Sequence, residues 1–361
     1  NLIITTIFHK AGILFTSYKD LSSSESDEEN AHSIFAYLLF KEFSPYPEFA
    51  EIILYNNIEY GNSKIIDDIP VPDEAYLLSL AADIAEVIIN SREKDINKKV
   101  AERIAEKNYK PEYKKILEQL YEENLINRIV TGEYRAELLS YVESIKLSKA
   151  EIMSLLRTLV YAVTFRSPDN FSHARTMEII VDLMGQITKQ NWNTMEKVRA
   201  AALLYNIGML TFDERSFEEA NSPLELQNLL TEAVKRVNMI FKEAELVDIV
   251  SMFDVMIGAE ILPENHMLTV KDIISGANMI KLADVLASLM DQKSQDYDVS
   301  CRNILAELKE ISKEEDMQIS MIELIEEYIE DIEARVKSSQ VSFRKRYQNV
   351  ISEYERLRSF D

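Results

Sequence analysis

The segment LLSLAADIAEVI, at residues 77–88, carries the pattern that decides the fold. Its apolar residues recur every three or four positions, at Leu77, Leu80, Ala81, Ile84, Val87 and Ile88. This spacing is typical of one face of an α-helix, whereas strand-like alternation is scarce along the chain. Similar stripes run through residues 177–187, 198–207 and 274–289. Only seven glycines and eight prolines occur in 361 residues, so the sequence predicts an all-α protein.

Part of this segment is found again later in the chain. Three pairs of segments align: IFHKAGIL at 7–14 with LLYNIGML at 203–210, FKEF at 40–43 with FKEA at 241–244, and LAAD at 80–83 with KLAD at 281–284. The offsets between partners are 196, 201 and 201 residues. A nearly constant offset, with one difference that a loop can absorb, indicates a duplicated domain.

Each copy resembles the HD-GYP branch of the HD phosphohydrolase superfamily. The resemblance implies a helical bundle around a two-metal site, in which the metals lower the pKa of a bound water. Its landmarks are an early histidine, His-Asp-x-Gly-Lys, a later histidine, His-His-Glu followed by Gly-Tyr-Pro, and Ala-Asp. The HDOD signalling domains, which also lose these ligands, are the alternative family. The resemblance covers the chain to about residue 320.

The first copy keeps only part of the ligand set that the resemblance implies. His9, His32 and Asp83 stand at ligand positions. Lys10 replaces the aspartate of the His-Asp doublet, and two asparagines at 56–57 replace the His-His doublet. An ammonium group at that position opposes a metal cation. We therefore expect Lys10 to act as a metal surrogate that pairs with Asp83.

The second copy keeps fewer of these positions. His173 matches the early histidine and Asp284 matches the aspartate of Ala-Asp. Tyr205 and Asn206 replace the His-Asp doublet, and Ala233 replaces the later histidine. We expect His173 and Asp284 to form a satisfied core pair. The sequence thus predicts no catalytic residues, no metal and no cofactor in either copy.

The C-terminal segment has a separate pattern, in which one apolar row recurs every seven residues. This spacing is that of a heptad seam. One interpretation is a helix packed back on its own domain. The other is an exposed helix that docks a protein partner or a second copy of the chain. The candidate contact residues are Ile322, Ile329, Val336, Phe343, Val350 and Leu357.

These patterns predict three parts of the chain. Residues 1–124 form a degenerate HD-GYP-like domain, residues 125–315 a second one, and residues 316–361 a heptad-patterned helical extension. The first copy lacks the segment that would carry the early histidine, so we expect that residue 1 is not the natural start. Within the second part, Ser148 and Glu151 have the spacing of a helix capping box.

Composition excludes several classes of function. The net charge of −22 argues against nucleic-acid binding, which needs a basic face, and disfavours anionic membrane surfaces. The single cysteine, Cys301, excludes an internal disulfide. No run of about 18 uncharged apolar residues occurs, so we expect no membrane span and a cytoplasmic location.

The sequence therefore predicts a catalytically inactive HD-GYP-like protein of bacteria, acting through protein partners as a scaffold, adaptor or signalling regulator. Two alternatives stay open. A dead phosphodiesterase pocket could serve as a sensor of cyclic di-GMP or another nucleotide. The first copy could also retain a metal-dependent phosphohydrolase activity that uses His9, His32 and Asp83.

Overall fold

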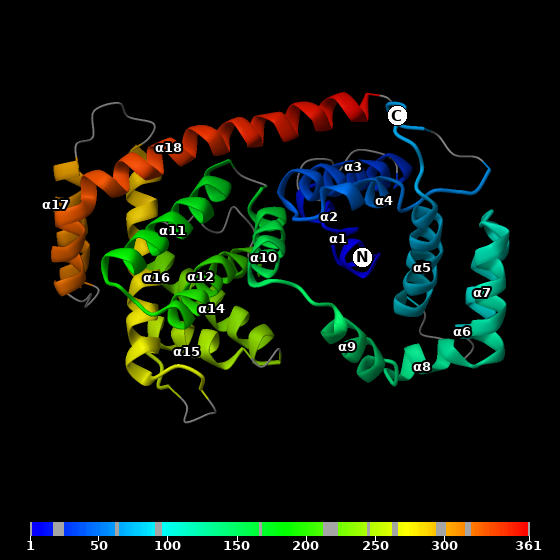
Figure 1. Cartoon of the computed structure of the whole chain (residues 1–361), viewed down its shortest axis with the longest axis horizontal. Helices are drawn as coiled ribbons and strands as arrows, with labels where there is room; N and C mark the ends of the chain where they lie inside the picture. The colour runs from blue at the N-terminus through cyan, green and yellow to red at the C-terminus, as the bar shows by residue number, and fades with distance from the viewer. Residues whose placement is uncertain are drawn as a thin grey trace. The chain divides into compact units, whose positions relative to one another are not determined.

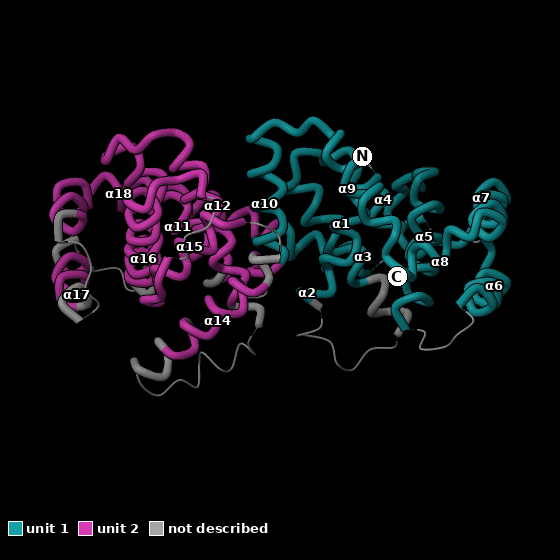
Figure 2. The backbone as a smooth tube through the Cα atoms, turned by 90° about the horizontal axis from the view of Figure 1, so that it is seen from below, with its two compact units in different colours: residues 1–162, 350–361 teal, residues 163–349 magenta. Residues whose placement is uncertain are grey.

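The computed structural model describes residues 2–16, 25–61, 65–90, 96–165, 168–211, 223–243, 246–261, 266–293, 301–314 and 319–359. Every regular element in these ranges is a helix, which confirms the all-α prediction. The chain divides into two compact units, coloured separately in Figure 2. Unit 1 comprises residues 1–162 and 350–361, and unit 2 comprises residues 163–349.

Unit 1 is built around α3, whose residues 33–40 are buried throughout. A helix that is buried on all sides must be covered by its neighbours, and α3 packs against α2 and α4. In turn, α5 packs against α1, α4 and α6. The helices that begin in unit 1 are shown in Figure 1: α1 (Leu2–Phe8), α2 (Ile13–Thr16), α3 (Glu25–Phe43), η1 (Pro47–Phe49), α4 (Ala50–Leu54), α5 (Asp73–Asn90), α6 (Ile96–Glu106), α7 (Pro111–Glu122), α8 (Leu125–Thr131), α9 (Arg135–Ser144) and α10 (Lys149–Thr164).

Unit 2 is built around α16, which packs against α11, α12, α15 and α17. In addition, α14 packs against α15 and η2. The remaining elements are α11 (Pro168–Ile187), α12 (Trp192–Tyr205), η2 (Asn206–Thr211), α14 (Pro223–Glu243), α15 (Val247–Met256), α16 (Val270–Lys293), α17 (Cys301–Glu314) and α18 (Ile319–Arg358).

Part of each unit consists of helices that follow a similar order and share some of their packing partners. In unit 1, α1 packs on α4 and α5, and α3 packs on α2 and α4. In unit 2, α12 packs on α15 and α16, and α14 packs on η2 and α15. The segments that align in the sequence lie on these corresponding helices: 80–83 on α5 and 281–284 on α16.

One close backbone contact also occurs in both units. A Cβ atom placed on Gly12 would lie 1.9 Å from the carbonyl oxygen of His32. A Cβ atom placed on Gly208 would lie 3.0 Å from the carbonyl oxygen of Ala233. Gly12 aligns with Gly208, and the 201-residue offset pairs His32 with Ala233. Each glycine thus lets a turn approach the equivalent point of the next long helix.

The boundaries of the units differ from the predicted ends of the parts at residues 124 and 315. The first core continues past residue 124, because Leu117 and Ile126 pack in one cluster with Leu80 and Ile84 of α5. The boundary between the units instead falls within α10. Residues 350–358 of α18 belong to unit 1 and its earlier residues to unit 2, so α18 is not a separate extension.

The predicted heptad seam is buried in the chain itself. Phe343 stacks on Phe171 with ring centroids 4.2 Å apart, and Tyr354 packs edge-on to Phe35. The helix is therefore packed back on its own fold, and the seam is not the exposed docking surface of the second interpretation. All six predicted contact residues are at most 6% exposed: Ile322, Ile329, Val336, Phe343, Val350 and Leu357.

The predicted capping box begins α10. The backbone N–H of Glu151 donates to Ser148 Oγ at 3.2 Å, and the backbone N–H of Ser148 donates to Glu151 Oε2 at 2.7 Å. The Glu151 carboxylate also accepts a 2.7 Å hydrogen bond from the Tyr46 hydroxyl. This prediction is confirmed in detail, and the box ties the start of α10 to the chain after α3.

A segment of α16, Val270–Met290, is long and apolar enough to cross a membrane by length and composition. However, 61% of its most apolar window is buried inside the protein, as in the core helix of a soluble protein.

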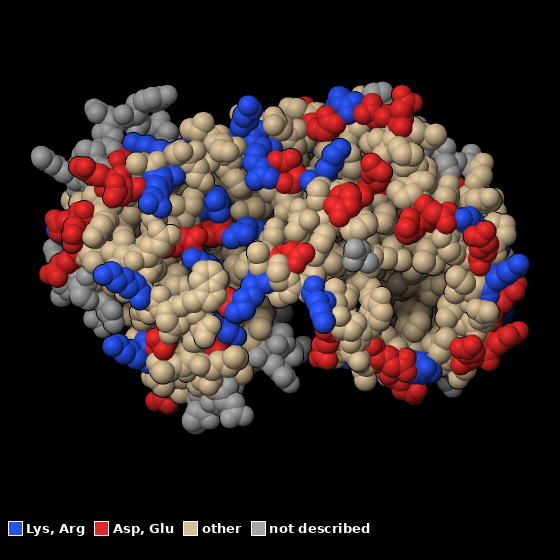
Figure 3. Space-filling view, viewed as in Figure 1, with Lys and Arg blue, Asp and Glu red and all other residues tan. Residues whose placement is uncertain are grey.

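On the face shown in Figure 3, Lys and Arg side chains occur interspersed with Asp and Glu side chains.

Candidate functional site

In unit 2, the two residues that the resemblance placed at ligand positions are in contact. His173 Nε2, on α11, lies 2.8 Å from Asp284 Oδ1, on α16. The Tyr205 hydroxyl, at the end of α12, donates to Asp284 Oδ2 at 3.1 Å. The side chains of His173 and Asp284 are each 21% exposed. Both carboxylate oxygens of Asp284 therefore have a protein partner in a half-buried cluster.

Asn206, the residue after Tyr205, points elsewhere. Asn206 is 4% exposed, and its amide donates to the carbonyl oxygen of Ala202 at 3.0 Å. It thus caps the end of its own helix, and its amide donates there and not to Asp284. Tyr205 is the residue of the doublet that reaches the cluster. Because a phenol donates to a carboxylate and binds metals poorly when protonated, this exchange favours a hydrogen bond over metal ligation.

In unit 1, the aspartate that aligns with Asp284 in the sequence contacts two cations. Asp83, on α5, is 6% exposed. Its Oδ1 accepts from Arg103 at 3.2 Å. Its Oδ2 accepts from the Lys107 ammonium at 2.9 Å and the Tyr109 hydroxyl at 2.6 Å. Two positive charges and a hydroxyl thus satisfy a carboxylate that would otherwise be costly to bury.

The pKa values of these partners change with their surroundings. Burial raises the pKa of Tyr109, and its hydrogen bond to Asp83 raises it further. For Arg103, burial lowers the pKa, but the negative charges of Asp83 and Glu86 and the hydrogen bond to Asp83 together outweigh that effect, and the net change is upward. Tyr109 therefore stays protonated as a donor and Arg103 stays charged at any physiological pH.

The expected pairing of Lys10 with Asp83 is wrong. Lys10 is exposed in the turn after α1, and no ion pair of Lys10 occurs among the described residues. Arg103 and Lys107 take the place that was predicted for it. The reason is topological: α5 and α6 pack on one another across a short connection, which brings their cation and carboxylate together.

The two histidines of the first copy do not join Asp83 in a ligand set. His9 Nδ1 lies 2.6 Å from the carbonyl oxygen of Thr6, one turn earlier. Burial lowers the pKa of His9, and the positive charge of Lys10 lowers it further, whereas the hydrogen bond to Thr6 raises it. His32 is partly buried on α3. In the part of the chain that the structure describes, no three His, Cys, Asp or Glu side chains are grouped so that they could hold a metal ion.

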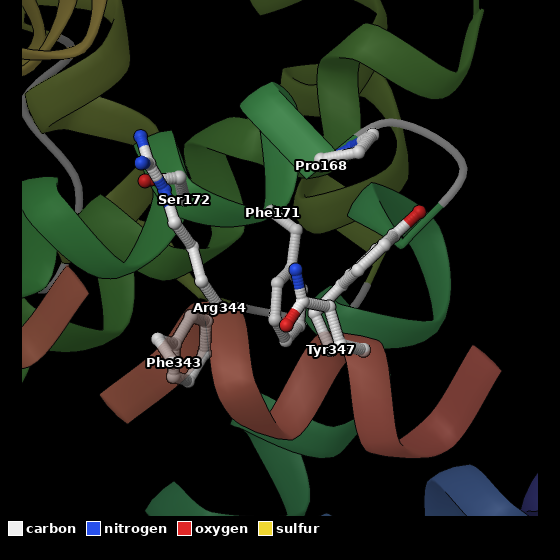
Figure 4. A pocket seen from close by; sticks show the side chains of 7 residues that line it. Pro168, Phe171, Ser172, Phe343, Arg344 and Tyr347 are labelled. Atoms are coloured by element: carbon white, nitrogen blue, oxygen red, sulfur yellow. The ribbon is translucent and has the colours of Figure 1, made fainter. Parts of the chain in front are cut away.

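A cavity of about 300 Å³ lies beside α11 and α18 in unit 2. Figure 4 shows Phe171 reaching from α11 between Phe343 and Tyr347 of α18, with Arg344 extending toward Ser172. Phe171 is 1% exposed and is stacked on Phe343. Because these ring faces already pack on each other, the cavity is a gap beside a helix–helix contact and offers a ligand little aromatic surface.

Arg103, Lys107 and Tyr109 are the site residues that the sequence did not predict. A signal for the first of them was available in the helical hairpin of α5 and α6. Asp83 precedes the end of α5 by the same number of residues as Arg103 follows the start of α6. Both residues thus lie equally far along the chain from the segment that joins α5 to α6, and these two helices are in contact.

Comparison of the chain with models of known protein families, with curated proteins and with solved structures found no match. The two aspartate clusters and the surface of the molecule are therefore the features from which a function can be inferred.

Proposed function

We propose that the chain is a catalytically inactive, internally duplicated HD-GYP-like protein that acts in bacteria as a scaffold, adaptor or signalling regulator. One observation carries the proposal. The aspartate at the retained ligand position of each copy has both carboxylate oxygens occupied by protein donors. These are Arg103, Lys107 and Tyr109 for one aspartate, and His173 and Tyr205 for the other.

A metal site has opposite requirements. A ligand carboxylate must present free lone pairs to the cation, and the surroundings must tolerate added positive charge. Around Asp83, a divalent cation would have to displace or approach an ammonium 2.9 Å from the carboxylate. The helices are kept because their apolar faces still need burial, while donors now satisfy the former ligands.

The kind of partner follows from charge. At a net charge of −22, nucleic acids and anionic membranes are repelled at long range, so the proposed partners are proteins. Partner capture should use the full chain, because α18 buries its apolar seam against the rest of the fold.

The metal content of protein purified under anaerobic conditions tests the proposal. We expect less than about 0.1 equivalent of iron, manganese or zinc in the wild-type chain. The exposed variant Lys10→Ala serves as a control and should give the same value. One equivalent or more, lost in Asp83→Ala or in His173→Ala, would overturn the proposal and assign a metal site to that copy.

The two alternatives draw no support from the geometry. A phosphohydrolase using His9, His32 and Asp83 needs these side chains in one group, whereas Asp83 is bound to Arg103 and Lys107. A nucleotide sensor needs an aromatic ring face on which a base can stack, whereas the ring faces beside the cavity at α11 and α18 pack on each other. Turnover of cyclic di-GMP that disappears in Asp83→Ala would establish the first alternative. Micromolar binding of the same nucleotide in calorimetry, without turnover, would establish the second.

A further inference from the structure

The helix α9 differs from its neighbours in burying nothing. All ten of its residues are exposed, whereas α7 and α8 bury Leu117 and Ile126. Four of its side chains are large enough to form an apolar surface: Leu138 (43% exposed), Leu139 (61%), Tyr141 (60%) and Val142 (39%). A helix of this length is marginal in water without packing, so something that covers its apolar side would stabilise it.

The charges on one face of α9 are arranged symmetrically about its centre. Arg135, Leu139 and Glu143 stand four residues apart and therefore form one row along the helix. Val142 and Ala136 flank this row. In the described part of the chain, neither Arg135 nor Glu143 has an ion-pair partner. The row thus presents a free cation, an exposed apolar centre and a free carboxylate, in that order.

The side of α9 away from this row makes one ion pair with another helix. The Glu137 carboxylate pairs with Arg128 of α8. The Ser144 hydroxyl donates to the carbonyl oxygen of Tyr141 at 2.6 Å. The row through Leu139 makes no such ion pair among the described residues and is open to an interaction.

We propose that this face of α9 pairs with α9 of a second copy of the chain, antiparallel and about a two-fold axis at Leu139. In that arrangement Arg135 of each copy faces Glu143 of the other, and the two Leu139 side chains meet on the axis. An isologous contact requires a self-complementary surface. A cation and a carboxylate equally far from a central leucine meet that requirement, whereas a different partner protein would have no need of it.

The local charge also favours a second copy. Two chains of net charge −22 repel each other over most of their surfaces. Residues 125–149, however, carry four basic and three acidic residues, a net charge of +1. This segment is therefore a place where another acidic chain can approach with little repulsion. The inference is independent of the proposed loss of catalysis.

Sedimentation velocity of the full chain over about 1–100 µM, at about 0.15 M salt, tests the proposal. The wild-type chain should show a species of twice the 41.7 kDa monomer mass that increases with concentration. Arg135→Glu and Glu143→Arg should each weaken dimerisation at least about tenfold, because like charges then face each other. An equimolar mixture of the two variants should form a heterodimer, since opposite charges face each other again. The chain carrying both substitutions should dimerise like the wild type.

Matched controls separate this effect from net charge. Lys115→Glu and Glu118→Arg make the same charge changes at exposed positions of α7 and should leave dimerisation unchanged. Leu139→Asp should give a monomer with the helical circular dichroism of the wild type, since Leu139 is not part of a core. A wild-type chain that is monomeric throughout, a dimer that persists in Leu139→Asp, or a variant mixture that stays monomeric would overturn the proposal.

Discussion

The Nε2 atom of His173 lies 2.8 Å from Oδ1 of Asp284, although 111 residues separate the two in the sequence. The helices α11 and α16 pack on each other and hold the contact in place. The Tyr205 hydroxyl binds the other oxygen of the same carboxylate. A histidine, an aspartate and a tyrosine from three helices thus form one connected polar cluster in unit 2.

Removing either donor of this cluster should destabilise the protein. We expect His173→Ala to lower the free energy of unfolding by about 1–3 kcal/mol, because Asp284 is left with an unsatisfied oxygen. Tyr205→Phe should cost about 1 kcal/mol for the same reason. Tyr141→Phe removes a hydroxyl from an exposed tyrosine and should have an effect below about 0.5 kcal/mol. Denaturant unfolding measures all three, and equal stability of Tyr205→Phe and the wild type would contradict the bond.

In unit 1, stability should depend on Lys107 and not on Lys10. Lys107 is 2.9 Å from the buried Asp83, so Lys107→Ala should cost about 1–3 kcal/mol in denaturant unfolding. Lys10→Ala, at an exposed position without an ion pair in the described structure, should stay within about 0.5 kcal/mol. The reverse order of the two effects would restore Lys10 as the partner of Asp83.

The pairing of Asp83 shows where prediction from the sequence ended. The resemblance identified the aspartate, because LAAD and KLAD align at a constant offset. It could not identify the cation, since Arg103 and Lys107 lie outside the family's motifs and reach Asp83 only through the packing of α6 on α5. Lys10, the nearest cation in the motif, lies in a turn that faces solvent.

The heptad seam illustrates the same limit. A seven-residue period predicts a helix with an apolar stripe, and α18 is that helix. The period does not say what covers the stripe. The covering side chains, such as Phe171 and Phe35, are far away in the sequence and belong to helices with no heptad pattern of their own. The helical class was thus predictable, whereas the contacts of α18 were not.

The protonation of His9 should make stability depend on pH. Burial lowers the pKa of His9 below its ordinary value of 6.5 in the folded state. The unfolded chain therefore binds the proton more readily than the folded protein. At a pH above the pKa that His9 has in the unfolded chain, the stability contributed by neutral His9 is complete. This stability falls as the pH decreases from there toward the pKa that His9 has in the folded protein. His9→Gln should flatten this decline between about pH 7 and pH 5. Parallel pH profiles of thermal unfolding for the two proteins would contradict the assignment.

The two glycines at the close approaches should differ in their sensitivity to substitution. In Gly12→Ala the added carbon would overlap the backbone of His32, which a side-chain rotation cannot relieve. We expect a loss of about 3 kcal/mol or more. In Gly208→Ala the nearest atoms are at 2.9 and 3.0 Å, so a small shift suffices and the loss should be about 1 kcal/mol. Denaturant unfolding of both variants checks the order, and a Gly12→Ala chain as stable as the wild type would contradict the contact.

A last prediction distinguishes a core seam from a docking seam on α18. Phe343 is 6% exposed and stacks on Phe171, so Phe343→Ala should lower the free energy of unfolding by about 3–5 kcal/mol. Val341, two residues earlier, is 74% exposed, and Val341→Ala should change it by less than about 0.5 kcal/mol. A docking residue would behave in the opposite way, since its loss would leave the isolated chain as stable as before. If Phe343→Ala unfolds at the wild-type denaturant concentration, α18 does not pack on α11 in solution, and its seam is then free to bind a partner.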